Sequence, residues 1–473
     1  MTIRKSVRIL AGFAASLAGL LPAQTALAQS ATGLDARAAA VIEHWTPERR
    51  AAAIPRDLLI DERGLGYLRL PNGNLQPYGH DIVAQADTAG PLFGTMTPAS
   101  GSTVASGTVT FTANVTDASG VKSVSMTIQK SGGLAQSFNM NKGSGDAWTI
   151  TLNGVTDGSW TWKAVAKDGA KPPNSTTSST ISFTAGSGGP PPPPPPPGTV
   201  SSSPWTTGVA KMAIGRIYFE MPSNPKATRW TAYVCSGTVV NDDPGNSGTV
   251  AADRSLILTA SHCVYDDEHK AFARNVLFIP DQMDTTGTGT DTNCNNDPKG
   301  CWSPAFGVVD VNWTTRVFPD NVAWDYAFYV VPNTGAHSGT TVTNAALDQN
   351  MTPMNISFGS VNIGSLGTAL GYSYSEDPKL MYCADTLANE TTSNGADYWL
   401  AGCGLTGGSS GGPWSQTFDT GTGDGPIISV NSWGYTNQPG MAGPKLVGTS
   451  ASCVFGAAQT NGLAAGNVAK TCP

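Results

Sequence analysis

The segment Ser255-Leu256-Ile257-Leu258-Thr259-Ala260-Ser261-His262-Cys263 is an apolar run of strand length that ends in a histidine and a cysteine. Similar short apolar runs recur along the last part of the chain, at 214–219, 327–331 and 426–430. Long polar loops separate these runs, whereas a βαβ fold would need helices between its strands. The sequence therefore predicts an all-β, barrel-type domain over residues 199–473.

Residues 91–186 show a different pattern, in which apolar and polar residues alternate. The alternating runs lie at 108–115, 121–128, 148–152, 160–165 and 180–184. Turns rich in Gly, Asp, Asn and Ser separate them, which is typical of a β-sandwich. In pattern, this stretch resembles bacterial immunoglobulin-like modules, although it has no cysteine pair. It carries no titratable constellation, so we expect it to bind an unknown ligand or to act as a spacer.

The N-terminus has the three parts of a secretory signal peptide. Basic residues precede an uncharged apolar run at 9–21, and Ala26-Leu27-Ala28 follows as a small-x-small cleavage pattern. A membrane anchor is the alternative, but the run is shorter than the ~20 residues that a span requires. We therefore expect residues 1–28 to be removed. The remaining chain would be secreted, extracellular or periplasmic, and would have no membrane partner.

Two further segments complete the predicted organisation. Residues 29–90 are interpreted as a pro-region, with a short helix over 35–53 interrupted near Pro47 and a turn-like stretch over 58–80; a flexible spacer is the alternative. Residues 187–198 contain eight consecutive prolines at 190–197. Such a run forms a polyproline II rod of roughly 25 Å, which favours a linker over a ligand for an SH3-type domain.

Composition narrows the possible partners and the compartment. The 473 residues carry a net charge of −7, which argues against nucleic acid because phosphate binding needs clustered Lys and Arg. The chain has eight cysteines and no CxxC pair, so disulfides are expected rather than a metal or redox site, and no cofactor is implied. Eight cysteines allow 105 pairings, which leaves their connectivity open. They are Cys235, Cys263, Cys294, Cys301, Cys383, Cys403, Cys453 and Cys472.

The string Gly407-Gly408-Ser409-Ser410-Gly411-Gly412-Pro413 is a candidate nucleophile loop. Glycines let the chain turn sharply and leave room for a substrate carbonyl. They also free backbone N–H groups, here those of Gly408 and Ser410, to face a developing oxyanion. An ordinary Gly/Ser turn is the alternative.

A serine nucleophile needs a base, and the chain contains five histidines. His44 and His80 fall in the predicted pro-region, His269 lies in an acidic run interpreted as a solvated loop, and His337 lies in a polar loop. Only His262 combines a strand end with a neighbouring cysteine that could fix it in place, with Cys235 as the expected partner.

The third member of such a site is a carboxylate that orients the imidazole. Asp325 opens the apolar strand in Trp324-Asp325-Tyr326-Ala327-Phe328, which favours a buried, directional role. Asp310 and Asp320 are the competitors, and a strand-edge turn residue is the alternative interpretation of Asp325.

The strings TASHC (259–263), WDYAF (324–328) and GGSSGGP (407–413) in this order resemble chymotrypsin-type serine peptidases over about residues 205–460. The surroundings of Cys235 and Cys263, and the segment 43–49, resemble the bacterial branch that includes glutamyl endopeptidases. The resemblance implies a double β-barrel and protein or peptide substrates. It also implies roles for His262 as general base, Asp325 as its orienter, Ser410 as nucleophile, and Gly408 and Ser410 as the oxyanion hole.

Two departures concern activation and specificity. Ser409 replaces the Asp that precedes the nucleophile in trypsin-like members, which puts activation by a new N-terminal amine in doubt. Members of that branch that prefer Glu place a His before a Trp-Gly pair, where this chain has Asn431 and Ser432. Thr406 does match the branch. A small, polar, uncharged pocket is predicted, formed by Thr406, Asn431, Ser432, Trp433 and Gly434.

Two other functions compete with peptidase activity. Gly408-x-Ser410-x-Gly412 also fits the nucleophile elbow of α/β-hydrolases, but that fold places its His after the Ser, and no His follows residue 410. A non-catalytic adhesion or binding protein built on a peptidase-like barrel would lack a member of the triad, and none is missing here. A serine endopeptidase is therefore the predicted function.

Overall fold

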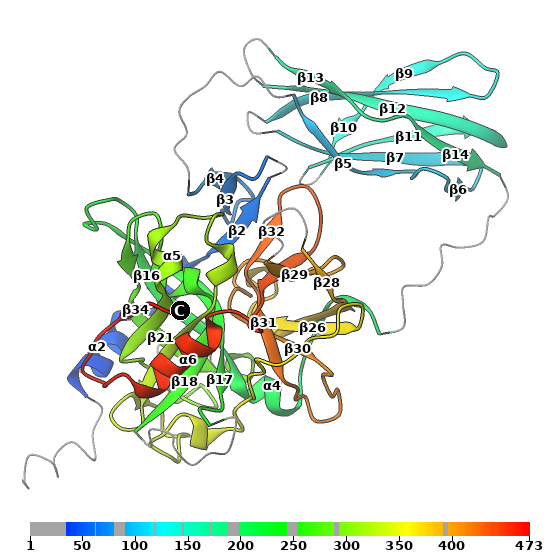
Figure 1. Ribbon diagram of the computed structural model, residues 1–473. Helices are drawn as coiled ribbons and strands as arrows, with labels where there is room; N and C mark the ends of the chain where they lie inside the picture. Colours follow the sequence, from blue (N-terminus) through cyan, green and yellow to red (C-terminus); the bar gives the residue numbers. More distant parts are fainter. Residues whose placement is uncertain are drawn as a thin grey trace, which may run out of the picture.

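The computed structural model describes residues 35–61, 63–79, 90–117, 120–143, 146–169, 173–186, 198–243, 253–287, 293–390 and 396–473. The predicted signal peptide and the proline run lie outside these residues. The described chain is all-β with a few short helices (Figure 1). The predicted architecture, two β-barrel halves and a preceding β-sandwich, is confirmed.

The sandwich consists of two sheets built from the alternating segments, and their strands pair antiparallel except at one edge, where Thr103 and Val104 pair in parallel with Thr184 and Ala185. The first has the order β10 (Asn141–Lys142), β11 (Ala147–Val155), β7 (Gly107–Thr116), β5 (Leu92–Thr97). The second has the order β6 (Thr103–Val104), β14 (Ile181–Ala185), β12 (Gly158–Asp168), β8 (Val121–Lys130), β9 (Gln136–Asn139), with β13 (Ser175–Thr177) on β12. Phe111 packs edge-on against Trp162 and Phe183, with ring centroids 5.3 and 5.7 Å apart. The inward face of each alternating strand thus forms the core between the sheets.

The first barrel half is a ten-stranded sheet. Its strands are β16 (Ile214–Pro222), β17 (Trp230–Val240), β18 (Arg254–Thr259), β21 (Arg274–Pro280), β22 (Cys301–Trp302), β23 (Phe306–Asp310), β24 (Ala327–Pro332), β25 (His337–Ser338), β34 (Val468–Lys470) and, from the N-terminal segment, β1 (Ile54–Pro55). Every residue of β18 is buried, because the sheet closes around a continuous apolar core. The 3₁₀ turn η1 (Ser261–Cys263) leaves the end of β18, and η3 (Val322–Trp324) precedes β24.

The second barrel half combines a five-stranded and a seven-stranded sheet. The first contains β15 (Val200–Pro204), β27 (Met381–Thr386), β26 (Leu366–Gly371), β30 (Pro413–Gln416) and β31 (Ile427–Val430). The second contains β28 (Ala388–Asn389), β29 (Asp397–Leu400), β33 (Met441–Pro444), β32 (Trp433–Tyr435), β2 (Asp57–Ile60), β3 (Gly66–Arg69) and β4 (Leu75–Pro77). The N-terminal segment, residues 35–61 and 63–79, thus supplies strands to both halves.

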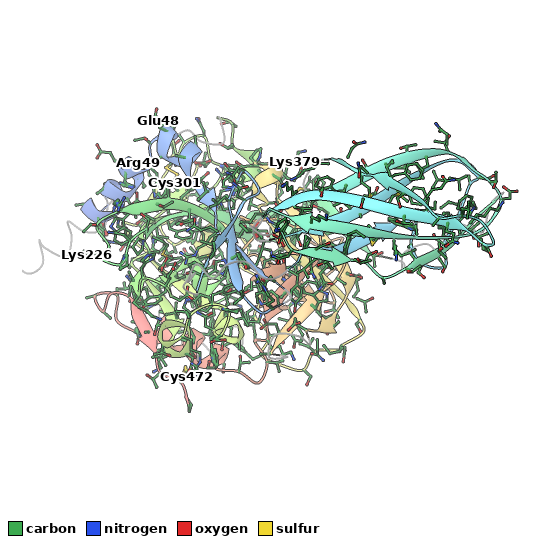
Figure 2. The ribbon with its side chains drawn as sticks, turned by 90° about the horizontal axis from the view of Figure 1, so that it is seen from above. Glu48, Arg49, Lys226, Cys301, Lys379 and Cys472 are labelled. Atoms are coloured by element: carbon green, nitrogen blue, oxygen red, sulfur yellow. A yellow bond between two sulfur atoms is a disulfide. The ribbon has the colours of Figure 1, made fainter. Side chains whose placement is uncertain are left out.

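The remaining elements are short. They are the hairpin β19 (Tyr265–Asp266) and β20 (Ala271–Phe272), the helices α2 (Ala36–His44), α3 (Pro47–Ala52), α4 (Gly208–Ala213), α5 (Val311–Thr315) and α6 (Ala451–Thr460), and the 3₁₀ turns η2 (Gln282–Asp284), η4 (Asp348–Asn350) and η5 (Tyr374–Glu376). Pro47 begins α3 behind the N-cap Thr46, which explains the interruption between α2 and α3. Figure 2 shows Glu48 and Arg49 of α3 at the surface of the barrel body.

The turn-like interpretation of residues 58–80 was wrong. This stretch forms β2, β3 and β4, and Leu58, Ile60, Leu68 and Tyr78 are buried in the same apolar cluster as the first barrel half. Its side chains find their apolar partners in the barrel rather than within the segment. The local sequence therefore looked too weakly apolar to form strands.

All eight cysteines form disulfides, which fits an oxidising, extracellular environment. The pairs are Cys235–Cys263, Cys294–Cys301, Cys383–Cys403 and Cys453–Cys472. In the part of the chain that the structure describes, no helix has the length and apolar character to cross a membrane.

Candidate active site

His262 and Asp325 meet between β18 and β24. Thr259 pairs with Ala327 in the antiparallel ladder, so the turns that flank these two strand ends lie side by side. Nδ1 of His262 lies 2.7 Å from Oδ2 of Asp325, and the backbone N–H of His262 donates to Oδ1 at 2.8 Å. Both side chains are fully buried. The carboxylate therefore holds the imidazole by two hydrogen bonds, which fixes the ring's orientation and presents Nε2 on its far side.

A second set of hydrogen bonds holds the carboxylate itself. The hydroxyl of Ser432 donates to Oδ2 of Asp325 at 2.5 Å. The hydroxyl of Ser261 lies 2.9 Å from the carbonyl oxygen of Trp324 and 2.8 Å from that of Tyr326, on either side of Asp325. The structure thus brings Asp325 to His262, while Asp310 caps α5 instead and Asp320 is exposed.

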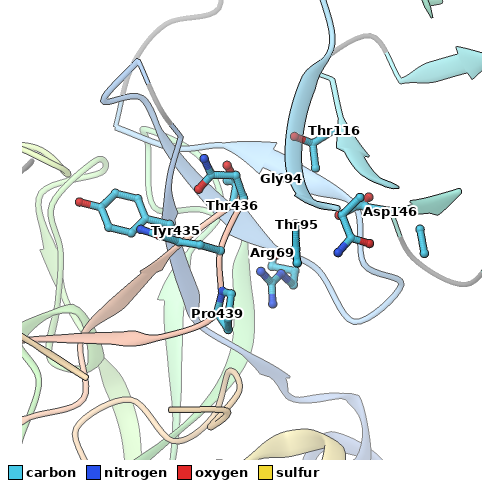
Figure 3. Close-up of a pocket in the computed structure, with 12 residues that line it drawn as sticks. Arg69, Gly94, Thr95, Thr116, Asp146, Tyr435, Thr436 and Pro439 are labelled. Atoms are coloured by element: carbon cyan, nitrogen blue, oxygen red, sulfur yellow. The ribbon is translucent and has the colours of Figure 1, made fainter. Parts of the chain in front are cut away.

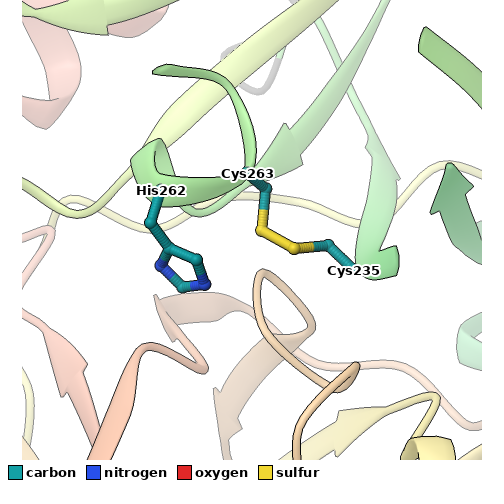
Figure 4. A group of neighbouring side chains, drawn as sticks. All are labelled: Cys235, His262 and Cys263. Carbon is teal, nitrogen blue, oxygen red and sulfur yellow. A yellow bond between two sulfur atoms is a disulfide. The ribbon is translucent and has the colours of Figure 1, made fainter. Parts of the chain in front are cut away.

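A disulfide anchors the turn that carries His262. Cys263 is bonded to Cys235 of β17 with an S–S distance of 1.99 Å (Figure 4). The Sγ atoms of Cys235 and Cys263 and a ring nitrogen of His262 lie within 4.8 Å of one another. This spacing would suit three ligands of one metal ion. The two sulfur atoms are bonded to each other and are not thiolates, so this group does not offer a metal its usual ligands.

Ser410 lies on a tightly turned loop beside the His262 segment. Gly408 and Gly411 have φ of +94° and +81°, a region that favours glycine. A Cβ on Gly411 would lie 2.1 Å from Oγ1 of Thr259, so the loop can approach β18 only because this residue is glycine. The backbone N–H of Ser236 donates to the carbonyl oxygen of Ser410 at 2.7 Å, which fixes the loop to β17.

The backbone N–H groups of Gly408 and Ser410 form no hydrogen bond with any residue that the structure describes. The neighbouring groups are all engaged: the N–H of Ser409 donates to Thr406, that of Gly411 to Asn431, and the carbonyl oxygen of Gly407 accepts from Tyr374. The two N–H groups expected to receive an oxyanion are therefore the ones left open within this loop.

The hydroxyl of Ser410 contacts the N-terminal segment. It donates to the carbonyl oxygen of Arg56 at 3.3 Å. Nε2 of His262 is buried and has no hydrogen-bond partner among the described residues. The carbonyl oxygen of Ser410 lies 3.9 Å from Sγ of Cys263, the residue after His262, but no hydrogen bond joins the Ser410 hydroxyl to the imidazole.

A cavity of about 170 Å³ adjoins Ser410 on the second barrel half. Thr406, Ser432, Trp433 and Gly434 line it, together with Leu405, Gly440 and Met441. Asp57 and Arg69 of the N-terminal segment also line it, with Oδ2 of Asp57 3.7 Å from Nη1 of Arg69. Burial raises the pKa of Asp57, and the positive charge of Arg69 offsets part of that rise.

Two of the predicted pocket residues have other partners, which is a correction to the pocket as predicted. Asn431 does not line the cavity: its amide nitrogen donates to the carbonyl oxygens of Leu370 and Ser409, and its Oδ1 accepts from Trp414. Ser432 lines the cavity, but its hydroxyl is engaged by Asp325. Asn431 and Ser432 therefore hold the Ser410 loop and Asp325 in place through their hydrogen bonds.

A buried carboxylate lies behind the cavity wall. The indole N–H of Trp433 donates to Oδ2 of Asp397 at 2.8 Å, and Asp397 is fully buried. Burial raises the pKa of Asp397 to about 7, with the hydrogen bond from Trp433 opposing the rise and the negative charge of Asp325 adding to it. No local sequence pattern marks Asp397 as part of the site.

The interpretation of the acidic run Asp266-Asp267-Glu268 as a solvated loop was wrong for its first two residues, while Glu268 is exposed. Asp266 is 3% exposed and Asp267 is fully buried. Nη2 of Arg56 lies 3.1 Å from Oδ2 of Asp266 and 3.9 Å from Oδ1 of Asp267. A run of acidic residues usually marks a surface, and its partner here lies some 210 positions away. Nothing local in the sequence could have paired them.

A second cavity, of about 330 Å³, lies where the sandwich, β3 and the loop after β32 meet (Figure 3). Asn114 and Asp146 line it from the sandwich, and Arg69 and Tyr435 line it from the other side. The wall is mixed in polarity and carries no cluster of catalytic groups.

No protein-family model matches the chain, and no curated protein sequence matches it. Solved structures that resemble it include the VesB protease of Vibrio cholerae, with a TM-score of 0.32, 12% identity and coverage of 52% of this chain and 64% of that one. Kallikrein-related peptidase 10 also has a TM-score of 0.32 at 12% identity and covers 55% of this chain and 100% of that one. Fibronectin(III)-like modules of Clostridium thermocellum CbhA have a TM-score of 0.16 at 14% identity, over 35% of this chain and 68% of that one. The chain thus spans just under two thirds of VesB.

Proposed function

We propose that the protein is a secreted serine endopeptidase in which Ser410 is the nucleophile and His262 its general base. The observation that carries the proposal is the double hydrogen bond of Asp325 to the backbone and ring of His262, with the Ser410 loop beside the turn that carries this histidine. A buried carboxylate that fixes the imidazole tautomer and stabilises the imidazolium is the arrangement that serine catalysis requires.

In the proposed reaction, Oγ of Ser410 attacks the carbonyl carbon of a peptide bond while its proton passes to Nε2 of His262. The oxyanion that forms accepts hydrogen bonds from the N–H groups of Gly408 and Ser410. The C–N bond then breaks, and His262 gives the proton to the departing amine, which leaves an acyl group on Ser410. Water attacks this ester with the same base, releasing the acid and restoring the hydroxyl.

The lining of the cavity beside Ser410 suggests the class of substrate. Apart from Asp57 and Arg69 of the N-terminal segment, the cavity beside Ser410 is lined by uncharged residues, among them Leu405, Gly434 and Met441. Such a lining suits a small or apolar side chain of a protein or peptide, while buried charge would be needed to attract a charged one. We propose residues 1–28 as the signal peptide and 29–90 as the pro-region.

The test is covalent labelling of the secreted protein with a fluorophosphonate, combined with hydrolysis of dye-labelled casein. Ser410→Ala should abolish labelling and lower hydrolysis by about 10⁴-fold or more. Ser409→Ala is the matched control, because the hydroxyl of Ser409 donates to the carbonyl oxygen of Thr406 and should be dispensable for both. Equal labelling of the wild type and Ser410→Ala would refute the proposal. A protein that is never labelled in any form would favour the binding-protein alternative.

A further inference from the structure

A segment of the chain itself lies across the candidate active site like a bound peptide. Its first part, β1, pairs with β17 of the first barrel half, with Ile54 opposite Tyr233. Its second part, β2, pairs with β32 of the second half, with Leu58 opposite Trp433. Arg56 lies between the two, at Ser410. Residues 54–60, which we call the plug, therefore use backbone pairing on both sides of the nucleophile.

The contact between the plug and Ser410 is not one from which cleavage can start. Attack requires Oγ to approach the carbonyl carbon, with its proton directed at the imidazole and the carbonyl oxygen held by N–H donors. Here the hydroxyl of Ser410 donates its hydrogen to the carbonyl oxygen of Arg56, while Nε2 of His262 has no partner among the described residues. The carbonyl oxygen of Arg56 thus accepts the hydrogen that Ser410 would have to give to His262, and no hydrogen bond joins these two side chains.

The plug's polar anchor is the side chain of Arg56. Its guanidinium is 1% exposed, ion-paired with Asp266 and Asp267, and positioned over the ring of Tyr233 with 5.5 Å from Cζ to the ring centroid. Tyr78, also from the N-terminal segment, accepts from Arg56 and donates to Asp267. On the barrel side, the receptor for this cation consists of Asp266, Asp267 and Tyr233.

Besides the contacts from Arg56 and Tyr78, the barrel itself donates hydrogen bonds to both carboxylates of the receptor. Oδ2 of Asp267 accepts from the backbone N–H of Phe318 at 2.6 Å and from the amide of Asn321 at 2.9 Å. Oδ1 of Asp266 accepts from the backbone N–H of His269 at 2.7 Å. Nε and Nη1 of Arg56 have no acceptor among the described residues, so the fit of this ligand is incomplete. Barrel groups thus hold both carboxylates, and Arg56 uses only part of its hydrogen-bonding capacity in their site.

We propose that Asp266, Asp267 and Tyr233 form a subsite for a guanidinium-type cation beside Ser410, and that Arg56 fills it to hold the plug across the cleft as an intramolecular inhibitor. The proposal deepens the proposed function and rests on it. A peptide that carries an arginine beside its reacting bond is the class of ligand that would compete for the subsite.

The experiment measures the rate at which a fluorophosphonate labels Ser410 in the full chain. Arg56→Ala should raise that rate at least tenfold, because the anchor is lost while β2 and the hydrophobic contacts remain. Arg63→Ala is the matched control: Arg63 belongs to the same segment, is 46% exposed, and pairs with Asp61 rather than with the receptor. Its labelling rate should equal that of the wild type.

Chemical rescue tests the subsite separately. Methylguanidinium chloride should slow the labelling of Arg56→Ala again, whereas tetramethylammonium chloride at the same ionic strength should not. Arg56→Lys keeps the positive charge but loses the planar guanidinium group with its several N–H donors. It should be labelled at a rate between those of the wild type and Arg56→Ala. This variant also provides a measurement if Arg56→Ala does not fold.

The outcomes separate the two proposals. If the wild type, Arg56→Ala and Arg56→Lys are labelled at one common rate, the plug is not an inhibitor, although the nucleophile is real. If labelling rises in Arg56→Ala but methylguanidinium has no effect, the cation subsite is refuted. If no form is labelled and folding is intact, the proposed peptidase function itself fails.

Discussion

The hydroxyl of Ser410 donates to the carbonyl oxygen of Arg56, a residue 354 positions earlier in the chain. The same arginine places its side chain on Asp266. One residue therefore contacts the candidate nucleophile through its backbone and the barrel wall through its charge. The plug pairs with strands of both barrel halves, so in the proposed peptidase a peptide substrate would have to displace these pairings before it reached Ser410.

Replacing Asp325 with Asn should lower kcat by about 10⁴-fold with little change in KM. An amide of the same shape can keep one contact but carries no charge to stabilise the imidazolium, and it favours the wrong tautomer of His262. The measurement is steady-state hydrolysis of a peptide substrate, with near-ultraviolet circular dichroism to verify the fold. A variant with wild-type kcat would remove Asp325 from the site.

Replacing Ser432 with Ala should lower kcat about tenfold by removing one charge-assisted hydrogen bond to Asp325. Ser432 is a positioning residue, so kcat should fall while KM stays close to the wild-type value, because the lost hydrogen bond acts on Asp325 and not on the substrate. Ser429→Ala is the control, since Ser429 is equally buried on the neighbouring strand β31 and donates to Pro444 instead. Equal kcat values for the two variants would contradict this role.

The buried carboxyl of Asp397 should make the folded state less stable as the pH rises towards neutrality. Its pKa in the folded state is about 7, above the ordinary value of 3.8, so its neutral form stabilises the fold. The contribution is complete below about pH 4 and is lost as the pH rises through 7. Asp397→Asn should therefore flatten the fall in unfolding free energy between these values.

Denaturant unfolding at several pH values measures this effect, and Asp320→Asn, at an exposed site, serves as the control. If the Asp397→Asn and wild-type curves run parallel across that window, the carboxyl is already ionised in the folded protein.

Much of the strand pattern could be predicted locally. The alternating run 108–115 and the apolar run 255–259 became β7 and β18 because one or both faces of these strands are buried, which residue type alone indicates. The run 58–80 could not be predicted in this way. Its strands exist because β32 and the barrel core provide their pairing and burial, and no local pattern encodes a partner so distant.

Pairings of polar groups were the least predictable features. Asn431 and Ser432 adjoin Trp433 in the sequence, yet one braces the Ser410 loop and the other holds Asp325. Alternate side chains of an extended segment point to opposite sides, so adjacent residues acquire unrelated partners. The eight cysteines likewise allowed many pairings until the fold placed their Cα atoms 5.2–6.3 Å apart in four pairs.

The sequence by itself determined the all-β class, the two strand patterns, alternating and continuously apolar, and the residue types from which a serine site could be built. These properties depend on the periodicity and the side-chain chemistry of each segment, which do not require contacts with the rest of the chain. Only the tertiary structure decided that Asp325 reaches His262, that Asp266 and Asp267 receive Arg56, and that residues 54–60 cross the cleft. Hydrogen bonds and ion pairs act over a few ångströms, so the fold must bring their partners together before they exist.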